Sequence, residues 1–275
     1  MIRKYLQKIY LALIFILLYA PIVTLIVLSF NQSKTRAKWG GFTLKWYKEL
    51  LKNEQIMSAF YTTLIIAFVS AAIATVIGTA AAIAIQGMKQ KWKTMYMGLT
   101  NIPMMNPDII TGISLMLMFV FVGSLLRFTE SLNFFTMLIA HITFSLPYVI
   151  LSVLPKFNQM DKSMPEAALD LGCTPLQSLF RVELPEIMPG VVTGGLMAFT
   201  MSLDDFVISY FTKGSSFQTL PLYIYGMTKK TVTPDMYALA TIIFFVILIL
   251  LIISNIISTK DERKQAKIRK SLNKT

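Results

Sequence analysis

This sequence holds few of the residues from which metal sites and hydrolytic active sites are built. Its 275 residues include one cysteine, Cys173, and one histidine, His141. A single cysteine excludes an intrachain disulfide and a CxxC metal motif. A lone histidine lacks the partners that a histidine-based metal site or triad requires. We therefore expect His141 to be a hydrogen-bonded or packing residue, and Cys173 to be a small packing residue at a corner between helices.

The sequence also lacks the common motifs for nucleotide binding and hydrolysis. The patterns GxxxxGK[ST], HExxH and GxSxG do not occur, so the chain has no P-loop with which to bind ATP. These absences predict a protein that is not an enzyme and has no metal or cofactor of its own.

Charged residues are scarce as well. They make up 15% of the chain, and 55% of the residues are hydrophobic with a mean hydropathy of +0.62. A soluble domain has about a quarter charged residues, so this composition predicts a membrane protein. The net charge of +12 comes from Lys and Arg at the ends of apolar runs. That placement favours contact with anionic lipid headgroups and argues against nucleic acid as a partner.

Six apolar runs are long enough to cross a bilayer as helices, for which about 20 residues are needed. We expect an all-α protein in which residues 1–258 form one six-helix transmembrane domain. A loop at 155–187 and a basic tail at 259–275 would be cytoplasmic. The first run is longer than the core of a cleaved signal, and Pro103 and Pro107 break the start of the third. The predicted spans are residues 9–30, 61–85, 103–122, 134–154, 188–211 and 236–258.

The positions of Lys and Arg predict the orientation of the chain. With the N-terminus inside, the inner segments hold sixteen of the 26 basic residues and the outer segments ten. This bias predicts that both termini are cytoplasmic. In the first outer segment, Thr43–Lys52 is expected to be a short helix at the membrane surface, with Trp46 and Tyr47 as interfacial anchors.

The longest polar segment, Asp161–Gly190, is predicted to form two short helices. For the first helix, Ser163 with Glu166 is expected to cap the start and Gly172 the end. For the second, Thr174 with Pro175 and Gln177 is expected to cap the start, and Pro185 to end the helix. Each helix carries an apolar stripe at helical spacing. The stripes contain Met164, Ala167, Ala168 and Leu171, then Leu176, Leu179 and Phe180. Such a face predicts a docking element for another protein.

Three carboxylates fall in or beside the apolar runs. Asp204 and Asp205 lie inside the fifth run, and Asp108 follows Pro107 in the third. A carboxylate at the bilayer centre costs at least about 2.5 kcal/mol, so it usually faces a cavity or a partner. Because adjacent helical residues point about 100° apart, at most one of the pair faces a given groove. One interpretation is therefore a route for a cation.

Structural interpretations of these carboxylates stay open beside the functional one. Asp108 fits a helix N-cap after a proline break. The pair at 204–205 fits contact with a cationic or hydroxyl group on another helix or subunit. An amine would also be attracted by aromatic rings, although each ring taken singly is more typical of packing or of the membrane interface. The candidate rings are Trp46, Tyr148, Tyr210 and Tyr223. Separately, Gly190 and Gly194 form a GxxxG pattern that favours close helix packing.

One spacing pattern resembles a known family. The chain resembles the EAA motif of the permeases of ABC importers. The matching residues are Glu166-Ala167-Ala168, then Gly172 after three residues, and Val182-Glu183-Leu184-Pro185 after nine more, with Val182 where that motif has Ile. Further stretches resemble, more narrowly, its spermidine/putrescine permeases. They are residues 41–47 (GFTLKWY), 107–109 (PDI), 141–144 (HITF), 202–205 (SLDD) and 220–225 (LPLYIY).

The resemblance implies a MetI-like permease fold in a bacterial plasma (inner) membrane. It implies three protein partners: a second homologous permease, a dimer of an ATPase that binds ATP and Mg, and an extracytoplasmic polyamine-binding protein. The motif residues would contact the ATPase, namely Glu166, Ala167, Ala168, Gly172, Leu184 and Pro185. Candidates for the substrate path are Trp46, Asp108, Tyr148, Asp204, Asp205 and Tyr223.

Three alternatives remain at the level of sequence. The first is an ABC permease for another small solute, although an anion path would need Arg, Lys or helix N-termini at its centre. The second is a stand-alone secondary transporter or channel, against which the absence of a visible internal repeat counts weakly. The third is a membrane enzyme, which the lack of a nucleophile with its base disfavours.

Overall fold

The protein is almost entirely helical in a computed structural model that describes residues 2–33, 38–127, 130–161, 163–215, 217–229 and 234–272. Within these residues six helices are long and apolar enough to cross a membrane, which confirms the predicted all-α class. They are Lys4–Ser29, Glu54–Gln86, Asp108–Leu125, Phe134–Gln159, Pro175–Asp204 and Pro234–Ile253. Of the basic residues used to predict the orientation, Lys34, Arg36, Lys162, Lys230 and Lys274 lie outside the described residues.

The chain forms two compact units. The first comprises Met1–Ser58 and Tyr223–Ile249, and the second comprises Ala59–Leu222 and Leu250–Thr275. Two long helices contribute to both units: α3 (Glu54–Gln86) and α12 (Pro234–Leu272). The α12 helix continues beyond the predicted sixth span and through most of the predicted tail.

In the first unit, the segment that follows α1 (Ile2–Ser29) is folded against α2 (Lys45–Lys52). The indole Nε1–H of Trp46 donates to the carbonyl oxygen of Asn31 at 2.7 Å, and the Ser29 and Tyr47 hydroxyls lie 2.7 Å apart. Trp46 is only 5% exposed. The prediction that Trp46 is an interfacial anchor is therefore wrong, and the packing alternative holds, since its ring and N–H stabilise this turn.

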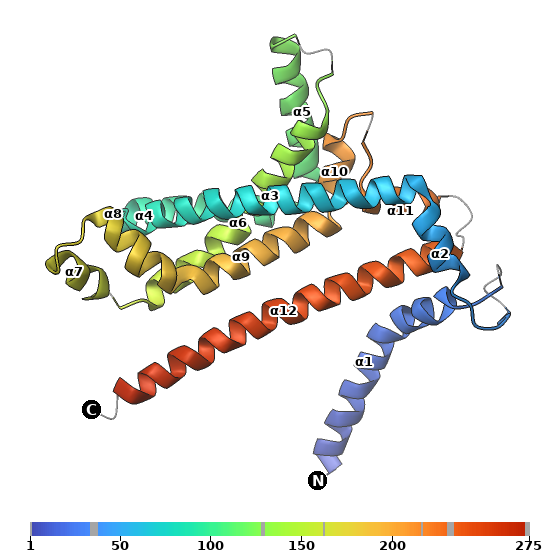
Figure 1. Ribbon diagram of the computed structural model, residues 1–275, viewed down its shortest axis with the longest axis horizontal. Coiled ribbons are helices and arrows are strands. Elements are labelled where there is room, and N and C mark those ends of the chain that lie inside the picture. The colour runs from blue at the N-terminus through green and yellow to red at the C-terminus, as the bar shows by residue number, and fades with distance from the viewer. Residues whose placement is uncertain are drawn as a thin grey trace. The chain divides into compact units, whose positions relative to one another are not determined.

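The second unit is built around α6 (Phe134–Gln159) and α9 (Leu184–Asp204), with α3 alongside them in the same core (Figure 1). A Cβ at Gly194 would lie 3.1 Å from the Val149 Cα, and one at Gly190 would lie 2.9 Å from the Ser152 carbonyl oxygen. The backbones of α6 and α9 therefore approach closely at these glycines. This confirms the packing role predicted from the GxxxG pattern.

The third predicted span is interrupted later than expected. Helix α4 (Gln90–Met105) includes Pro103, and a new helix, α5 (Asp108–Leu125), begins after Pro107. Asn106 is extended, with φ −75° and ψ 140°, because the ring of the following proline disfavours the helical conformation there. The spanning helix thus starts at Asp108 rather than at residue 103. It packs against α10 (Val207–Thr212), where a Cβ on Gly112 would lie 2.9 Å from Phe211.

The polar segment forms α7 (Ser163–Asp170), α8 (Pro175–Ser178) and a π-helical turn, η1 (Leu179–Glu183). Two predicted caps are confirmed. Gly172 has φ +88°, and Thr174 exchanges hydrogen bonds with Gln177. The predicted cap at Ser163 is wrong, because α7 begins at Ser163 and its N–H donates to Asp161 Oδ1 at 3.0 Å.

Pro185 does not end the second short helix, contrary to the prediction. Residues Pro175–Asp204 form one continuous helical segment. The wide turn η1, in which the Leu184 N–H bonds the Leu179 carbonyl five residues back, lies directly before the proline. A π-helical turn changes the hydrogen-bond register, and Pro185 therefore lies in the first turn of α9, where its missing N–H is tolerated.

Candidate functional site

The fifth span is broken at Asp205, which the sequence placed inside one continuous helix. Helix α9 ends at Asp204, and Asp205 is extended with ψ 123°. The Asp205 carboxylate accepts the backbone N–H of Ile208 at 3.2 Å and that of Ser209 at 2.7 Å. These two N–H groups belong to the first turn of α10, so Asp205 stabilises the start of that helix as a capping carboxylate does.

His141 lies beside this break and is fully buried, with 1% of its surface exposed. Its Nδ1 is 2.7 Å from Ser202 Oγ on α9, and its Nε2 is 2.9 Å from Ser209 Oγ on α10. The same Nε2 is 3.6 Å from Asp205 Oδ2, which is too long for a hydrogen bond. The prediction of a hydrogen-bonded core histidine is confirmed.

A second contact extends this cluster to α3. The Ser70 and Ser202 hydroxyl oxygens lie 3.0 Å apart, and the Ser70 hydroxyl donates to the Ala67 carbonyl at 3.3 Å. The buried polar cluster, defined here as Ser70, His141, Ser202, Asp205 and Ser209, therefore links four helices. The sequence analysis missed its serines because small hydroxyl residues are common in apolar helices. The seven-residue spacing of Ser202 and Ser209 across the carboxylate pair was the available signal.

Asp204 differs from its neighbour in exposure. Asp204 is exposed, whereas the side chain of Asp205 is only 7% exposed. The two carboxylates still interact electrostatically. The structural alternative for this pair was contact with a cationic or hydroxyl group, but Asp205 is hydrogen-bonded instead by backbone N–H groups of α10. Asp204 is left as the carboxylate of the pair that is available to a ligand.

Asp108 on α5 and Tyr148 on α6 interact electrostatically. Asp108 is exposed in the first turn of α5, and its charge acts on the half-buried Tyr148 hydroxyl. Pro107 occupies the N-cap position of α5, and no side chain caps that helix. The N-cap interpretation of Asp108 is therefore wrong, although a carboxylate in the first turn of a helix is favoured by the helix dipole.

The remaining two path candidates belong to the first unit. Trp46 and Tyr223 are both buried, at 5% and 7% exposure. Tyr223 lies in α11 (Leu220–Thr228) and interacts with the Asn53 side chain and with Asp235. The structure thus shows packing and hydrogen bonding at these two residues, and it leaves Asp108, Tyr148 and Asp204 as the accessible candidates in the second unit.

The predicted coupling residues lie mainly on the surface. Glu166, Ala167, Gly172 and Pro185 are exposed, Leu184 is half-buried and Ala168 is buried where α7 packs against η1. The large apolar side chains around them face outward: Leu171 is 87% exposed, Leu176 69% and Phe180 63%. These three residues are called the apolar knob below. The backbone and side chain of Ser163 lower the pKa of the Asp161 carboxyl at the base of this segment.

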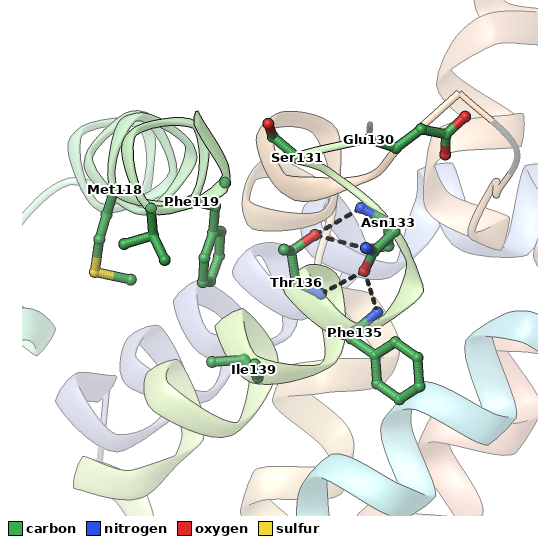
Figure 2. A pocket seen from close by; sticks show the side chains of 10 residues that line it. Met118, Phe119, Glu130, Ser131, Asn133, Phe135, Thr136 and Ile139 are labelled. Atoms are coloured by element: carbon green, nitrogen blue, oxygen red, sulfur yellow. Dashed lines mark hydrogen bonds between the residues drawn. The ribbon is translucent and has the colours of Figure 1, made fainter. Parts of the chain in front are cut away.

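Two apolar cavities lie elsewhere in the second unit. One of about 500 Å³ runs between α3 and α9 beside Phe180. The other, of about 570 Å³, lies between α5 and the first turn of α6 (Figure 2). There Asn133 and Thr136 form a capping box, and the Glu130 side chain points away from the apolar residues Phe119 and Ile139. Neither cavity holds one of the predicted path residues.

Residues 74–263 match the model of a family described as binding-protein-dependent transport system inner membrane component. The chain is 38% identical to the spermidine/putrescine transport system permease protein PotC of Haemophilus influenzae, over 95% of this chain and 99% of that protein. It is also 38% identical to the putrescine transport system permease protein PotI of Escherichia coli, over 83% of this chain and 82% of that protein. A bacterial ABC transporter involved in alginate import has a similar fold, with a TM-score of 0.71 and 17% identity over 95% of this chain and 96% of that chain.

Proposed function

This chain belongs to the family of binding-protein-dependent transport system inner membrane components, and from that premise we propose that it forms part of the polyamine path of an ATP-driven importer. The MetI-like permease fold that the sequence predicts is confirmed by the family match and by the shared architecture. The chain is thus a multi-pass permease of a membrane. The polyamine substrate, the path residues and the coupling residues are the proposed part.

The observation that carries the polyamine substrate is the exposed Asp204 carboxylate at the end of a spanning helix. No Lys or Arg lies between Val182 and Asp204 in the sequence, so this segment offers no cation of its own to neutralise the charge. An uncompensated carboxylate at such a place attracts a cation. Asp108, with the Tyr148 hydroxyl near it, offers a second negative charge in the same unit. Spermidine and putrescine, named for the relatives, are flexible cations with several amines.

The partners follow from the kind of system to which the family belongs. We propose that a second permease completes the path, that two ATPase subunits bind ATP and Mg, and that an extracytoplasmic protein delivers the polyamine. The permease itself carries no catalytic residue in this proposal. The apolar knob is the surface that supports contact with the ATPase, because large exposed apolar groups at the membrane-proximal surface usually mark an interface. Both termini would then be cytoplasmic.

The continuous helix from Pro175 to Asp204 suggests how the ATPase acts on the path. A helix of 30 residues is roughly 45 Å long at 1.5 Å per residue. One end carries Leu176 and Phe180 of the knob, and the other end carries Asp204. A displacement of the knob is therefore passed along this continuous helix, through the π-helical turn before Pro185, to the carboxylate. In this proposal the helix links ATP binding to the substrate path.

Uptake of radiolabelled spermidine into vesicles that contain the assembled transporter tests the function. We expect ATP-dependent uptake that putrescine competes for, and a strong loss of uptake in Asp204→Asn at unchanged protein level. Glu130→Gln, which neutralises an exposed carboxylate in the segment between α5 and α6, away from the coupling loop, is the matched control. Normal spermidine uptake in Asp204→Asn contradicts the path assignment. Uptake of another solute in place of polyamines contradicts the substrate.

A further inference from the structure

The buried polar cluster joins four helices through side-chain hydrogen bonds. The Ser70 hydroxyl oxygen lies 3.0 Å from that of Ser202 and 3.3 Å from the Ala67 carbonyl oxygen. His141 uses both ring nitrogens, Nδ1 at 2.7 Å from Ser202 Oγ and Nε2 at 2.9 Å from Ser209 Oγ. A neutral imidazole has one donor and one acceptor nitrogen, and a hydroxyl can take either role, so both contacts are satisfied in either tautomer.

The chain of hydrogen bonds crosses the break in the fifth span. It links Ser209 on α10, His141 on α6, Ser202 on α9 and Ser70 on α3. Ser202 lies two residues before Asp204, and Ser209 lies four residues after Asp205. His141 therefore holds both sides of the two-residue break at 205–206 from one ring. The Asp205 carboxylate fixes the same turn of α10 through the N–H of Ser209 at 2.7 Å.

We infer that His141 is a positioning residue that sets the orientation of the Asp204 carboxylate. The positioning role itself is independent of the proposed function. Only its expected effect on polyamine uptake rests on the proposal that Asp204 lines the substrate path. The break itself has extended backbone at Asp205, so the helical hydrogen-bond ladder does not continue from α9 into α10. The two bonds of His141 join the side chains on either side of this break. Without them the last turn of α9 and the first turn of α10 lose the side-chain link between them, and the end of α9 is less restrained.

A general packing role of His141 would have a different effect from a positioning role. Substitution of Ser145 distinguishes these two roles, because Ser145 lies one turn from His141 on α6, is fully buried, and has no hydrogen-bond partner at its Oγ. Ser145→Ala therefore removes a buried hydroxyl from the same helix without interrupting the chain of bonds. His141→Phe replaces the imidazole by another aromatic ring and removes both bonds, and Ser209→Ala removes the bond to α10 alone.

The test uses a nitroxide spin label on the assembled transporter in nanodiscs. The single native cysteine makes this practical, since Cys173→Ala gives a permease without other labelling sites. One label is placed at position 204 by Asp204→Cys. A second is placed at position 188 by Met188→Cys, on the exposed side of α9 four turns away. We expect His141→Phe and Ser209→Ala to raise the mobile component of the spectrum at position 204 severalfold. Ser145→Ala should leave it unchanged.

Two results overturn the inference. In the first, the label at 204 stays as ordered in His141→Phe as in the parent. In the second, positions 188 and 204 loosen equally, which would make His141 an ordinary core residue. Polyamine uptake by His141→Phe in the permease that retains Asp204 gives a separate answer. A raised KM for spermidine with little change in maximal rate is expected. Loosening at 204 with normal uptake would leave the positioning role intact and contradict the proposed function of Asp204.

Discussion

Asp204 and Asp205 are adjacent in the chain, yet one carboxylate is exposed and the other is bound by the N–H groups of Ile208 and Ser209. The difference arises from the end of α9 between them. Asp204 keeps helical geometry, and Asp205 turns away with ψ 123°. Because their environments differ, replacing the two residues should affect different properties of the protein.

Asp205→Ala is expected to destabilise the permease. It removes the acceptor of two backbone N–H groups at the start of α10, and the loss of such a cap costs about 1–2 kcal/mol. Asp205→Asn, which keeps an acceptor oxygen, should cost less. Thermal unfolding in detergent measures the difference as a lower Tm. Asp204→Ala is the control, and we expect its Tm to equal that of the parent. A lower Tm in Asp204→Ala alone would reverse the two assignments.

Gly194→Leu is expected to separate α6 from α9. Even a Cβ at this position would lie 3.1 Å from the Val149 Cα and 3.2 Å from the Ser152 Cβ. Overpacking of this kind costs about 1–3 kcal/mol. Gly98→Leu on α4 is the matched control, because nothing lies within 4 Å of its added Cβ. There the higher helix propensity of leucine should stabilise the helix by up to about 1 kcal/mol. Equal losses of Tm at both positions would contradict the close packing.

Gly172→Asp and Glu166→Lys are expected to abolish ATP-dependent uptake while the permease still inserts into the membrane. At φ +88° a side chain is strained at position 172, and the turn between α7 and α8 must change. Glu166 is exposed, so its replacement changes the surface without disturbing the core. Copurification of the ATPase with the permease measures the contact. Full uptake in both variants would show that this loop does not couple the two proteins.

A flexible joint within the continuous helix should uncouple the knob from the path. Replacing Val182 and Glu183 by glycine costs about 1 kcal/mol per residue relative to alanine in a helix. The alanine pair at the same positions is the control. We expect the glycine pair to bind the ATPase and to lose spermidine uptake, whereas the alanine pair keeps both. Equal uptake by the two pairs would show that rigidity of this element is not needed.

The six spans could be predicted from sequence because the length and apolarity of a spanning helix are properties of the local chain. The glycine contacts of α9 were predictable for the same reason, since a GxxxG pattern describes one helix face. The break at Asp205 was not, because Asp205 and Phe206 are not helix breakers. It is held by His141 from α6, 64 residues earlier in the chain, and by N–H groups that exist only once α10 has formed.

In the candidate site, too, local features could be predicted from the sequence, and features that depend on distant contacts could not. The sequence identified Asp204 and Asp108 by their charge in apolar surroundings, and it could not decide which member of the 204–205 pair is accessible. Pro185 was misjudged because proline usually ends a helix, and the π-helical turn that accommodates it has no sequence pattern. Trp46 was misjudged because an amphipathic ring fits an interface as well as a buried hydrogen bond.

The small residues on one side of α9 have a mechanical consequence. Gly190 and Gly194 leave hollows on α9 that groups of α6 fill, with Ser152 beside both of them. Sliding α9 along its axis would drive these groups against the larger side chains that flank the glycines. The contact of His141 with Ser202, at 2.7 Å, joins the same two helices nearer to Asp204. Helices α6 and α9 are therefore expected to move as one body when the permease changes conformation.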